Sequence, residues 1–401
     1  MEAEVMLKRQ AFLERIKPFI DKDIVKIITG IRRSGKSTLM AQVREVLVKR
    51  GVSENQIITI NFEDLRYRSK TLQALHEEIL NQYSGDRLYL FFDEIQELES
   101  WEELINSLRV TIDSDIYLTG SNSRLLSGEL ATLLAGRYVE IRLYPFSFKE
   151  IITISAISNR SDVEEAFRHF IRFGGFPFIY RNQLDSRATL DYLEDLYNSI
   201  ILKDIVHRYG IRNVALFEKI MRYLMESMGN TLSSINLIKY LKQEKRSISN
   251  ETIYNYIAYA EDSMLLHRVG REEIKGKALL KFQEKIYLTD HGFREGMFGS
   301  NQRDINRVLE NIVYIELLRR GYTVHIGKVG DREIDFTAGK SEGKVYIQVA
   351  YLLSDVSVIE REFRVYRAIP DNYPKYVLSM DNNDFSQDGI IHRNIIDWLL
   401  E

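Results

Sequence analysis

Residues Gly30 to Ser37 have the types and spacing of a phosphate-binding loop, G-x-x-x-x-G-K-S. The short apolar run Val25–Ile28 precedes the loop and a helical pattern follows it, which is the strand–loop–helix context that this motif needs. Backbone N–H groups of such a loop, and of the helix N-terminus after it, bind phosphate oxygens. We therefore predict an ATP site lined by nine consecutive residues, namely Gly30, Ile31, Arg32, Arg33, Ser34, Gly35, Lys36, Ser37 and Thr38.

Two side chains of this loop have distinct chemistry. The Lys36 ammonium is long enough to reach the outer phosphates, so we assign it a catalytic role, and the Ser37 hydroxyl is placed to coordinate Mg²⁺. The alternative is a glycine loop that arose by chance, which the flanking strand and helix disfavour.

A second pair of chemical groups follows the apolar run Arg87–Phe92. Asp93 at the end of this strand can hold Mg²⁺ and its water shell, and Glu94 can polarise a water that attacks the phosphate. The alternative is a strand that ends in two acids without a function. Because one strand separates this pair from the phosphate-binding loop, we predict an Mg²⁺-dependent hydrolytic site with Glu94 as the catalytic base.

The strand predicted over Ile116–Thr119 runs into two small polar residues, Ser121 and Asn122. If this strand neighbours the strand before the loop, these side chains contact the terminal phosphate and sense its hydrolysis. Arg137 is the predicted catalytic arginine, in cis or from a neighbouring subunit, with Arg124 as the alternative. For either arginine, a surface ion pair with a nearby acid is equally compatible with the sequence. An arginine acting in trans would require a homo-oligomer.

These residues need a scaffold, and the pattern of the first 155 residues provides one. Short apolar strands alternate there with segments of helical periodicity, which predicts an α/β architecture with a largely parallel sheet. Over the whole chain we predict four domains: a P-loop ATPase core at 1–155, a helical region at 156–229, a winged helix at 230–297 and an α/β nuclease-like domain at 298–401.

Several longer stretches resemble a known family. "GIRRSGKST", "LYLFFDEIQ", "YLTGSNSRLLSGELATLLAGRY" and "LYPFSFKEI" are similar to the prokaryotic ATPases of the AAA superfamily that carry a C-terminal domain of unknown function. The resemblance continues through "FGGFPFIY", "LYNSIILKDIVHRYGIRN" and the C-terminal "EIDF" and "YIQVAY". It implies an ATPase core with its Walker A and Walker B motifs, a winged-helix middle and a nuclease-like end, and it leaves the biological task open.

The winged helix is predicted from two amphipathic helices and the hairpin after them. Leu232–Gln243 has Ile235, Ile238 and Leu241 on one face, and Ser249–Ser263 forms the second helix. Such a module binds DNA, or it works as a lever against a protein partner, and the sequence favours neither.

Composition limits the partners. A net charge of −3 and a pI near 6.3 give no global signature of nucleic-acid binding, so DNA contact would depend on a local patch. Between residues 265 and 285 there are six Lys and Arg against three Glu, a modestly basic stretch. The chain has no cysteine, no signal-peptide core and no apolar run of spanning length, so we expect a cytoplasmic protein without a membrane partner.

The last domain has a pattern of acids. Glu310 lies on a predicted helix, Glu333 and Asp335 share one face of a strand, and Gln348 and Ala350 share a face of the next strand. This layout resembles the PD-(D/E)XK nucleases, in which the acids hold Mg²⁺ and a lysine activates water.

Ala350 stands where that lysine would be, so we predict a nuclease-like domain that does not cut. Lys328 or Lys344 is the alternative source of the lysine. Ordinary solvated acids on an unrelated α/β module are the other alternative.

Two functions remain open from the sequence. The first is an ATP-hydrolysing switch or motor that acts on nucleic acid or on a DNA-bound partner. The second is a non-enzymatic scaffold or signalling protein, gated by a nucleotide that it turns over slowly.

Overall fold

The computed structural model describes residues 7–126, 134, 136–243, 248–274, 278–299 and 304–401. Two compact units make up the chain. Unit 1 runs to Pro145 and adds Asp262–Met264, and unit 2 contains Phe146–Glu261 and Leu265–Glu401. Apart from Asp262–Met264, the three domains predicted after residue 155 therefore lie in one compact unit.

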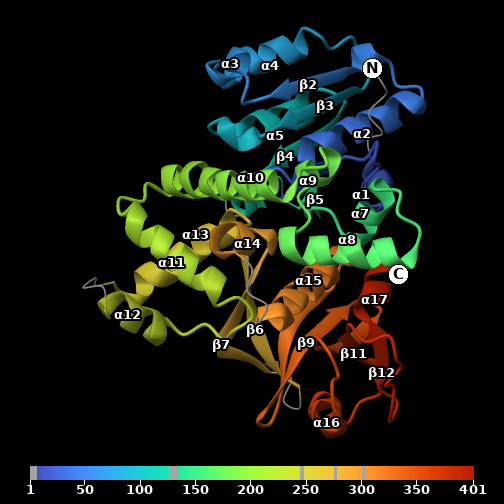
Figure 1. Ribbon diagram of the computed structural model, residues 1–401. Coiled ribbons are helices and arrows are strands. Elements are labelled where there is room, and N and C mark those ends of the chain that lie inside the picture. The colour runs from blue at the N-terminus through green and yellow to red at the C-terminus, as the bar shows by residue number, and fades with distance from the viewer. Residues whose placement is uncertain (1–6, 127–133, 135, 244–247, 275–277, 300–303) are drawn as a thin grey trace. The chain divides into compact units, whose positions relative to one another are not determined.

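Unit 1 is an α/β unit around a parallel sheet, as predicted (Figure 1). Its five strands are ordered β2-β3-β4-β1-β5. The strands are β1 (Val25–Thr29), β2 (Ile57–Asn61), β3 (Leu88–Asp93), β4 (Ser114–Gly120) and β5 (Tyr138–Arg142). The α-helices are α1 (Gln10–Ile16), α2 (Lys36–Lys49), α3 (Leu65–Arg68), α4 (Leu72–Leu80) and α5 (Trp101–Thr111). Because β4 lies between β1 and β3, the carboxyl ends of these three strands meet at one edge.

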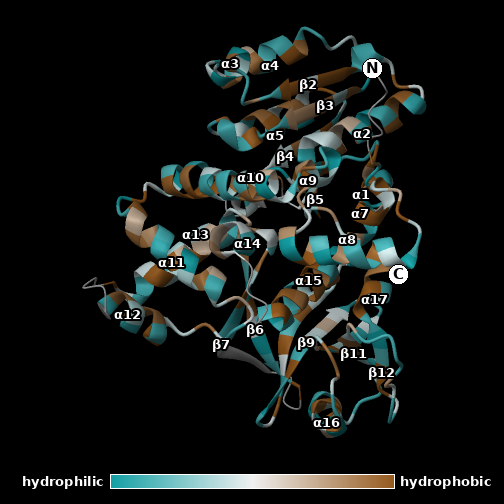
Figure 2. Ribbon diagram, viewed as in Figure 1, coloured by the Kyte–Doolittle hydropathy of each residue, from teal (hydrophilic) through white to brown (hydrophobic). Residues whose placement is uncertain are grey.

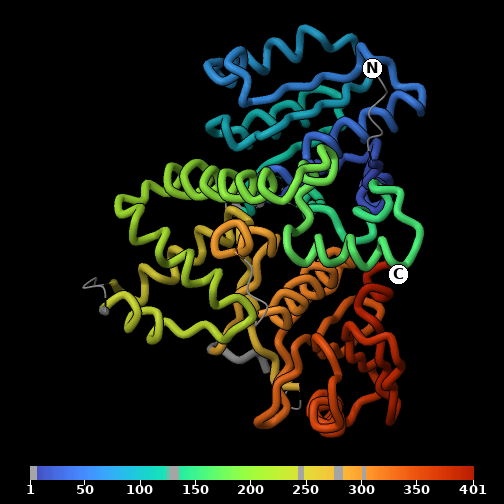
Figure 3. The backbone as a smooth tube through the Cα atoms, in the orientation of Figure 1, coloured from blue at the N-terminus to red at the C-terminus, as the bar shows by residue number. Residues whose placement is uncertain are grey.

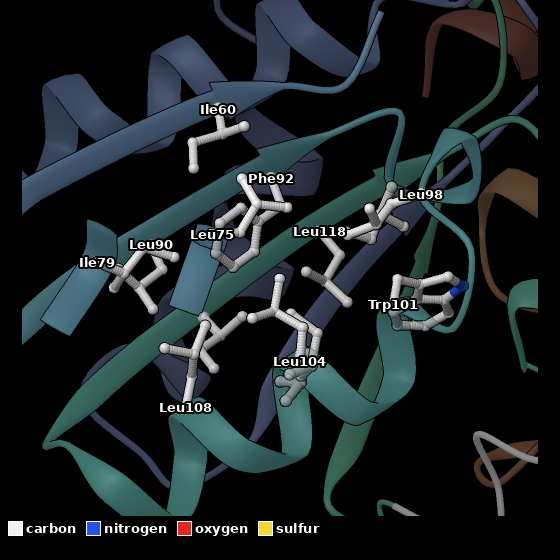
Figure 4. Close-up of a cluster of buried hydrophobic side chains, with 14 of the residues drawn as sticks. Ile60, Leu75, Ile79, Leu90, Phe92, Leu98, Trp101, Leu104, Leu108 and Leu118 are labelled. Atoms are coloured by element: carbon white, nitrogen blue, oxygen red, sulfur yellow. The ribbon is translucent and has the colours of Figure 1, made fainter. Parts of the chain in front are cut away.

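Successive side chains of the strands point to opposite faces of this sheet, and each face is covered by a hydrophobic core. Leu90 and Phe92 of β3 and Leu118 of β4 enter one core with Leu104 and Leu108 of α5 (Figure 4). The strand residues that alternate with these, Tyr89, Phe91 and Tyr117, enter a second core on the opposite face of the sheet, which includes residues of α1 and α2. Sheets covered on both faces have continuously apolar strands, and the strands of unit 1 are largely hydrophobic in Figure 2.

An ion pair is buried inside unit 1, at the sheet edge opposite the phosphate-binding loop. Lys26 of β1 and Asp115 of β4 are 0% and 1% exposed and are hydrogen-bonded to each other. Asp115 also accepts hydrogen bonds from the Tyr117 hydroxyl at 2.8 Å and from the Asp21 amide at 2.9 Å. Burial lowers the pKa of Lys26, and the Asp115 carboxylate opposes this effect.

Unit 2 combines helices with a mixed sheet of seven strands, ordered β12-β11-β10-β9-β8-β6-β7. The strands are β6 (Leu266–Glu273), β7 (Ala278–Leu288), β8 (Thr323–Val329), β9 (Arg332–Lys340), β10 (Gly343–Val349), β11 (Lys375–Ser379) and β12 (Ile391–Asn394). The helices are α7 (Phe148–Ile154), α8 (Arg160–Phe173), α9 (Pro177–Arg181), α10 (Ser186–Ser199), which continues as a π-helix over Ile200–His207, α11 (Val214–Glu226), α12 (Ser234–Gln243), α13 (Asn250–Asp262), α14 (Gly292–Phe298), α15 (Ile305–Arg319), α16 (Val356–Arg364) and α17 (Ile395–Leu400).

The hairpin predicted as the wing of a separate domain is instead the edge of this sheet. β6 pairs with β7 and also with β8, with Arg271 opposite Ile326. Figure 3 follows the backbone from this hairpin to the red strands at the C-terminus. Hydrogen bonds thus cross the predicted boundary between residues 297 and 298, because β6 leaves its second edge open and β8 occupies it.

The two helices before the hairpin form where the sequence predicts them. In α13 the apolar stripe is buried as expected, and Ser249 caps the helix by accepting from the Thr252 amide at 3.1 Å. In α12 the predicted inward face is wrong in part. Leu241 is fully buried as predicted, but Ile235 is 64% exposed. Leu237 is fully buried in its place, because it lies four residues before Leu241 on the same face.

A buried carboxylate holds the glycine pair Gly174–Gly175 in place. Asp290 accepts hydrogen bonds from the Gly175 amide at 2.8 Å and from the Gly292 amide at 2.9 Å. A Cβ on Gly174, whose φ is +72°, would lie 1.7 Å from the Asp290 carboxylate, so only glycine fits there. Burial raises the pKa of Asp290 to about 7, although the two amides act in the opposite direction.

This raised pKa predicts a pH-dependent loss of stability. The folded state holds the Asp290 proton more tightly than the unfolded state, so this contribution is complete below about pH 4 and is lost as the pH rises to about 7. Asp290→Asn should remove that part of the decline, which is on the order of 4 kcal/mol at most. Urea unfolding of parent and variant at pH 5 and pH 8 measures the difference, and equal declines would contradict the assignment.

Among the described residues, no helix is both long and apolar enough to cross a bilayer.

Candidate functional site

The phosphate-binding loop connects β1 to α2 at the carboxyl edge of the sheet in unit 1. Arg33 and Gly35 adopt positive φ angles of 66° and 100°, which turn the chain so that α2 begins at Lys36. Gly30 has no room for a side chain, because a Cβ would lie 2.4 Å from the Leu143 carbonyl oxygen. Ser37, the second residue of α2, is exposed to solvent. The N-terminus of this long helix provides N–H groups and a partial positive charge for an anion.

Lys36, Ser121 and Glu94 form a hydrogen-bonded chain beside the loop. The Lys36 ammonium donates to the Ser121 hydroxyl at 2.7 Å and to the Gly30 carbonyl at 3.1 Å. Ser121 donates to the Glu94 carboxylate at 3.2 Å, and the Lys36 ammonium lies 3.4 Å from that carboxylate. Three residues that are distant in sequence are thus brought together by the carboxyl ends of β1, β3 and β4.

Glu94 is ionised and held in place. Burial alone would raise the pKa of Glu94, but the Lys36 ammonium and a hydrogen bond from the Gln96 amide outweigh it and hold the pKa below its ordinary value. The backbone of Glu94 is left-handed with φ 51°, and its amide donates to the Thr119 hydroxyl at 2.9 Å. An ionised carboxylate in a fixed position has the chemistry of a general base.

Asp93 lies one residue earlier, at the end of β3, and is 7% exposed. Its two carboxylate oxygens accept from the Thr119 hydroxyl and from the Asn61 amide, the latter at 3.4 Å. Each oxygen keeps lone pairs for a cation or its water shell, and Mg²⁺ prefers such oxygen ligands. Asp93 and Ser37 therefore fit the predicted metal, which would supply positive charge beside the phosphates when bound.

The remaining predicted site residues have different positions. Ser121 contacts Lys36 as described above, and Asn122 is buried beside it at 6% exposed. Because β4 does neighbour β1, the condition for their predicted sensing role is met. Arg32 lies 3.7 Å from Glu63.

Arg137 does not reach this site within its own chain. It precedes β5 at the amino edge of the sheet, where its guanidinium lies 3.6 Å from Asp23. In a parallel sheet the amino and carboxyl edges are separated by the length of the strands, so a role in cis is wrong. A role in trans stays a prediction, and the side chain of Arg124 lies outside what the structure describes.

Arg9 is a contact of the loop that the sequence motifs do not predict. It is 3% exposed and donates to the carbonyl oxygens of Ser34 at 3.3 Å and Tyr144 at 3.0 Å. It therefore ties the phosphate-binding loop to the residues that follow β5. In the sequence, Arg9 is marked only by its place in a Lys-Arg pair before a helix, which is too weak a signal to identify its role.

Comparison with known proteins agrees with this geometry. The family described as "AAA domain" matches residues 22–152, and a domain of unknown function (DUF8612) matches residues 164–304. An uncharacterized protein of Haemophilus influenzae is 36% identical over 405 residues, which span 100% of both chains. An uncharacterized protein of Methanocaldococcus jannaschii is 32% identical over 403 residues, covering 94% of this chain and 86% of that one. The chain belongs to the family of these two uncharacterized proteins, and its residues 22–152 form an AAA domain of the P-loop ATPase type.

Solved structures that resemble this chain are less similar in sequence than these two relatives. A Walker-type ATPase of Pyrococcus abyssi has a TM-score of 0.47 at 15% identity and covers 73% of this chain and 96% of its own. The Aeropyrum pernix ORC1 protein in complex with DNA has a TM-score of 0.34 at 11% identity and covers 74% and 93%.

Unit 2 of this AAA-type ATPase contains the acids predicted for the C-terminal domain. Glu333 and Asp335 of β9 line a polar cavity of about 420 Å³ together with Glu310 of α15. A second cavity of about 450 Å³ also contains Glu310 and Asp335 and adds Gln348 and Ala350. Glu333 and Asp335 thus lie on the same face of β9, as predicted, whereas Ala350 lies one residue past the end of β10.

The lysine beside these acids is neither of the two that the sequence suggested. Lys344 is 2.8 Å from Glu272, and neither Lys344 nor Lys328 is among the residues lining the two cavities. Lys285 of β7 reaches the acids instead, 2.7 Å from Glu333 and 3.4 Å from Glu310. The sequence could not indicate this contact, because it depends on the pairing of the hairpin with β8.

Proposed function

We propose that this protein is an Mg²⁺-dependent ATPase that works as a switch or motor on nucleic acid or on a DNA-bound partner. The observation that carries the proposal is the convergence of Lys36, Asp93 and Glu94 at one edge of the sheet, each in a position suited to a separate task. Lys36 binds the outer phosphates, Asp93 and Ser37 hold Mg²⁺, and Glu94 accepts a proton from the attacking water. We further propose that the nuclease-like domain does not cleave DNA, since Ala350 cannot activate water.

One observation favours the alternative, a scaffold that is gated by a nucleotide and hydrolyses it slowly. Glu94 is bound to Lys36 and Ser121 in this structure, so its carboxylate is engaged by the lysine that must bind phosphate. Glu94 becomes a free base only after Lys36 turns to the nucleotide. Turnover would be slow if Glu94 stayed on Ser121.

The nucleic-acid part of the proposal rests on the helix pair. Asn250, Tyr254 and Asn255 are exposed on one side of α13, as a groove-facing helix requires. The basic count of the hairpin gives less support, because at least three of its six cations are ion-paired within unit 2. Arg271 and Lys285 each lie 2.7 Å from Glu333. Arg268 lies 3.1 Å from Glu261. DNA binding through this hairpin would therefore be weak, and its few phosphate contacts would be lost as the salt concentration rises.

Lys36→Ala should weaken ATP binding by at least about 100-fold, which is ~2.7 kcal/mol, because the charged hydrogen bonds to the outer phosphates are lost. Fluorescent nucleotide titration measures the affinity, and phosphate release with Mg²⁺ measures turnover. Lys49→Ala, at the exposed end of the same helix, is the matched control and should behave like the parent.

The same assays separate the two functions. Multiple turnovers by the parent, accelerated by duplex DNA in low salt and not in high salt, support the switch or motor. Tight ATP binding with one slow turnover and no response to DNA supports the scaffold. Parental affinity in the Lys36→Ala variant would contradict the nucleotide site itself.

A further inference from the structure

The Lys285 side chain is a buried cation within the acid cluster of unit 2. It is 5% exposed, and its ammonium contacts Glu310 of α15 and Glu333 of β9. Three carboxylates act on this ammonium, since the charges of Glu310, Asp335 and Glu333 hold the pKa of Lys285 above its ordinary range although burial would lower it. Lys285 is therefore charged, and it joins two elements that meet only in the folded sheet.

The acids around Lys285 are satisfied by protein groups. Glu310 also accepts from the Tyr287 hydroxyl at 3.1 Å, and Glu333 also lies 2.7 Å from Arg271. One oxygen of Asp335 accepts from the Val349 amide at 2.8 Å. The three acids thus share two internal cations, which leaves the cluster with little excess negative charge.

The next polar residue, Gln348, continues this network away from Lys285. Its side-chain oxygen accepts from the Asp335 amide at 3.3 Å, and its side-chain nitrogen donates to Glu362 at 2.9 Å. Glu362 is also bound by Arg361 at 2.7 Å. Among the described residues, no group of three or more His, Cys, Asp or Glu side chains is arranged to hold a metal ion.

We propose that the Lys285 ammonium is an internal cation that takes the place of a divalent metal ion between Glu310, Glu333 and Asp335. This deepens the proposal that the domain does not cleave DNA, because it names the group that neutralises the acids. A tethered ammonium holds the carboxylates of α15 and β9 together, and it requires no ion from solution. It cannot act as a Lewis acid toward a phosphate or a water.

The physical reason for Lys285 is the repulsion among the buried acids. Burial raises the pKa of both Glu310 and Asp335. The charge of Glu333 acts in the same direction on the pKa of Glu310, and the charge of Glu310 does so on that of Asp335, so the ionised acids destabilise one another. A positive charge between them removes this penalty. Without Lys285, the cluster must take up protons, admit a cation from solution, or open.

The test is Lys285→Met in the full chain, compared with the parent, both carrying Asp93→Asn so that the ATP site contributes no Mn²⁺ binding. The parent should bind no Mn²⁺ at this cluster by electron paramagnetic resonance, and neither EDTA nor Mn²⁺ should move its unfolding temperature. Lys285→Met should unfold about 5–10 °C lower, because a buried charge pair is broken. Mn²⁺ should bind this variant and recover about half of the loss, since an ion that binds only the folded state stabilises it.

Two further variants keep the outcome decisive. Lys344→Met removes a less buried lysine of the same sheet and should be insensitive to Mn²⁺. Lys285→Met with Glu310→Gln removes the repulsion and should recover stability without Mn²⁺, even if the single variant does not fold.

Mn²⁺ binding by the parent that Asp335→Asn abolishes would overturn the inference, and so would a Lys285→Met variant as stable as the parent. Plasmid cleavage in the same samples distinguishes the two proposals. Binding without cleavage ends only the inference, whereas cleavage abolished by Asp335→Asn also ends the proposal that the domain does not cut.

Discussion

Glu94→Gln is expected to lower the rate of ATP hydrolysis by about 10²–10⁴-fold while ATP binding is retained, because the amide cannot accept the proton of the attacking water. The substitution keeps the size of the side chain and its contact with Ser121. It removes the charge that engages Lys36 at 3.4 Å, so nucleotide affinity should be equal to that of the parent or higher. Single-turnover phosphate release measures the chemical step, and nucleotide titration measures binding.

Glu99→Gln is the control for this prediction, since Glu99 is an exposed acid just beyond the same turn. It should hydrolyse ATP at the parental rate. If Glu94→Gln does so as well, the base is another group. A Glu94→Gln protein that binds ATP without releasing phosphate is also suited to capturing the partner that recognises the ATP-bound state.

The second large effect concerns stability. Lys26→Met should destabilise the protein by about 3–5 kcal/mol, because Asp115 would keep its charge in a fully buried position without its cation. Tyr117 and the Asp21 amide would still donate to Asp115, but neutral donors do not replace an ammonium. Urea unfolding followed by circular dichroism measures the change in the free energy of unfolding.

The double variant Lys26→Met with Asp115→Leu should recover most of that loss, because both charges are then absent. Arg44→Met provides the contrast. Its ion pair with Glu54 is exposed, so its removal should change stability by less than about 1 kcal/mol. A loss in Lys26→Met no greater than in Arg44→Met would show that the buried pair is not needed.

The meeting of the site residues at one edge of unit 1 could be predicted from the sequence, because each lies in a local motif at a strand end. The loop from Gly30 to Ser37 and the acids Asp93 and Glu94 each follow an apolar strand, and parallel strands bring such ends together. Ser121 was found by the same reasoning. Thr119, which binds both acids, carried the same signal at the end of β4.

The errors arose where a contact depends on pairing between distant elements. Arg137 is predicted as a catalytic residue from its residue type alone. The edge of the sheet at which it lies depends on the direction in which β5 runs, which the sequence does not give. Lys285 was counted as a DNA-facing charge, because the sequence does not show that β6 pairs with β8. The prediction puts Ile235 on the wrong face, because the apolar residues of this short helix can be grouped into more than one stripe with helical spacing.

The pairing of β6 with β8 has a consequence for how the chain can be divided. A fragment that begins at residue 298, the boundary that the sequence suggested, would leave β8 with an unpaired edge, and such edges recruit strands from other molecules. The fragment would therefore tend to aggregate, however well its own strands folded. The other fragment would carry the β6–β7 hairpin without the strand β8 that it pairs with. A cut that spares the ladder must therefore leave residues 265–401 on one piece.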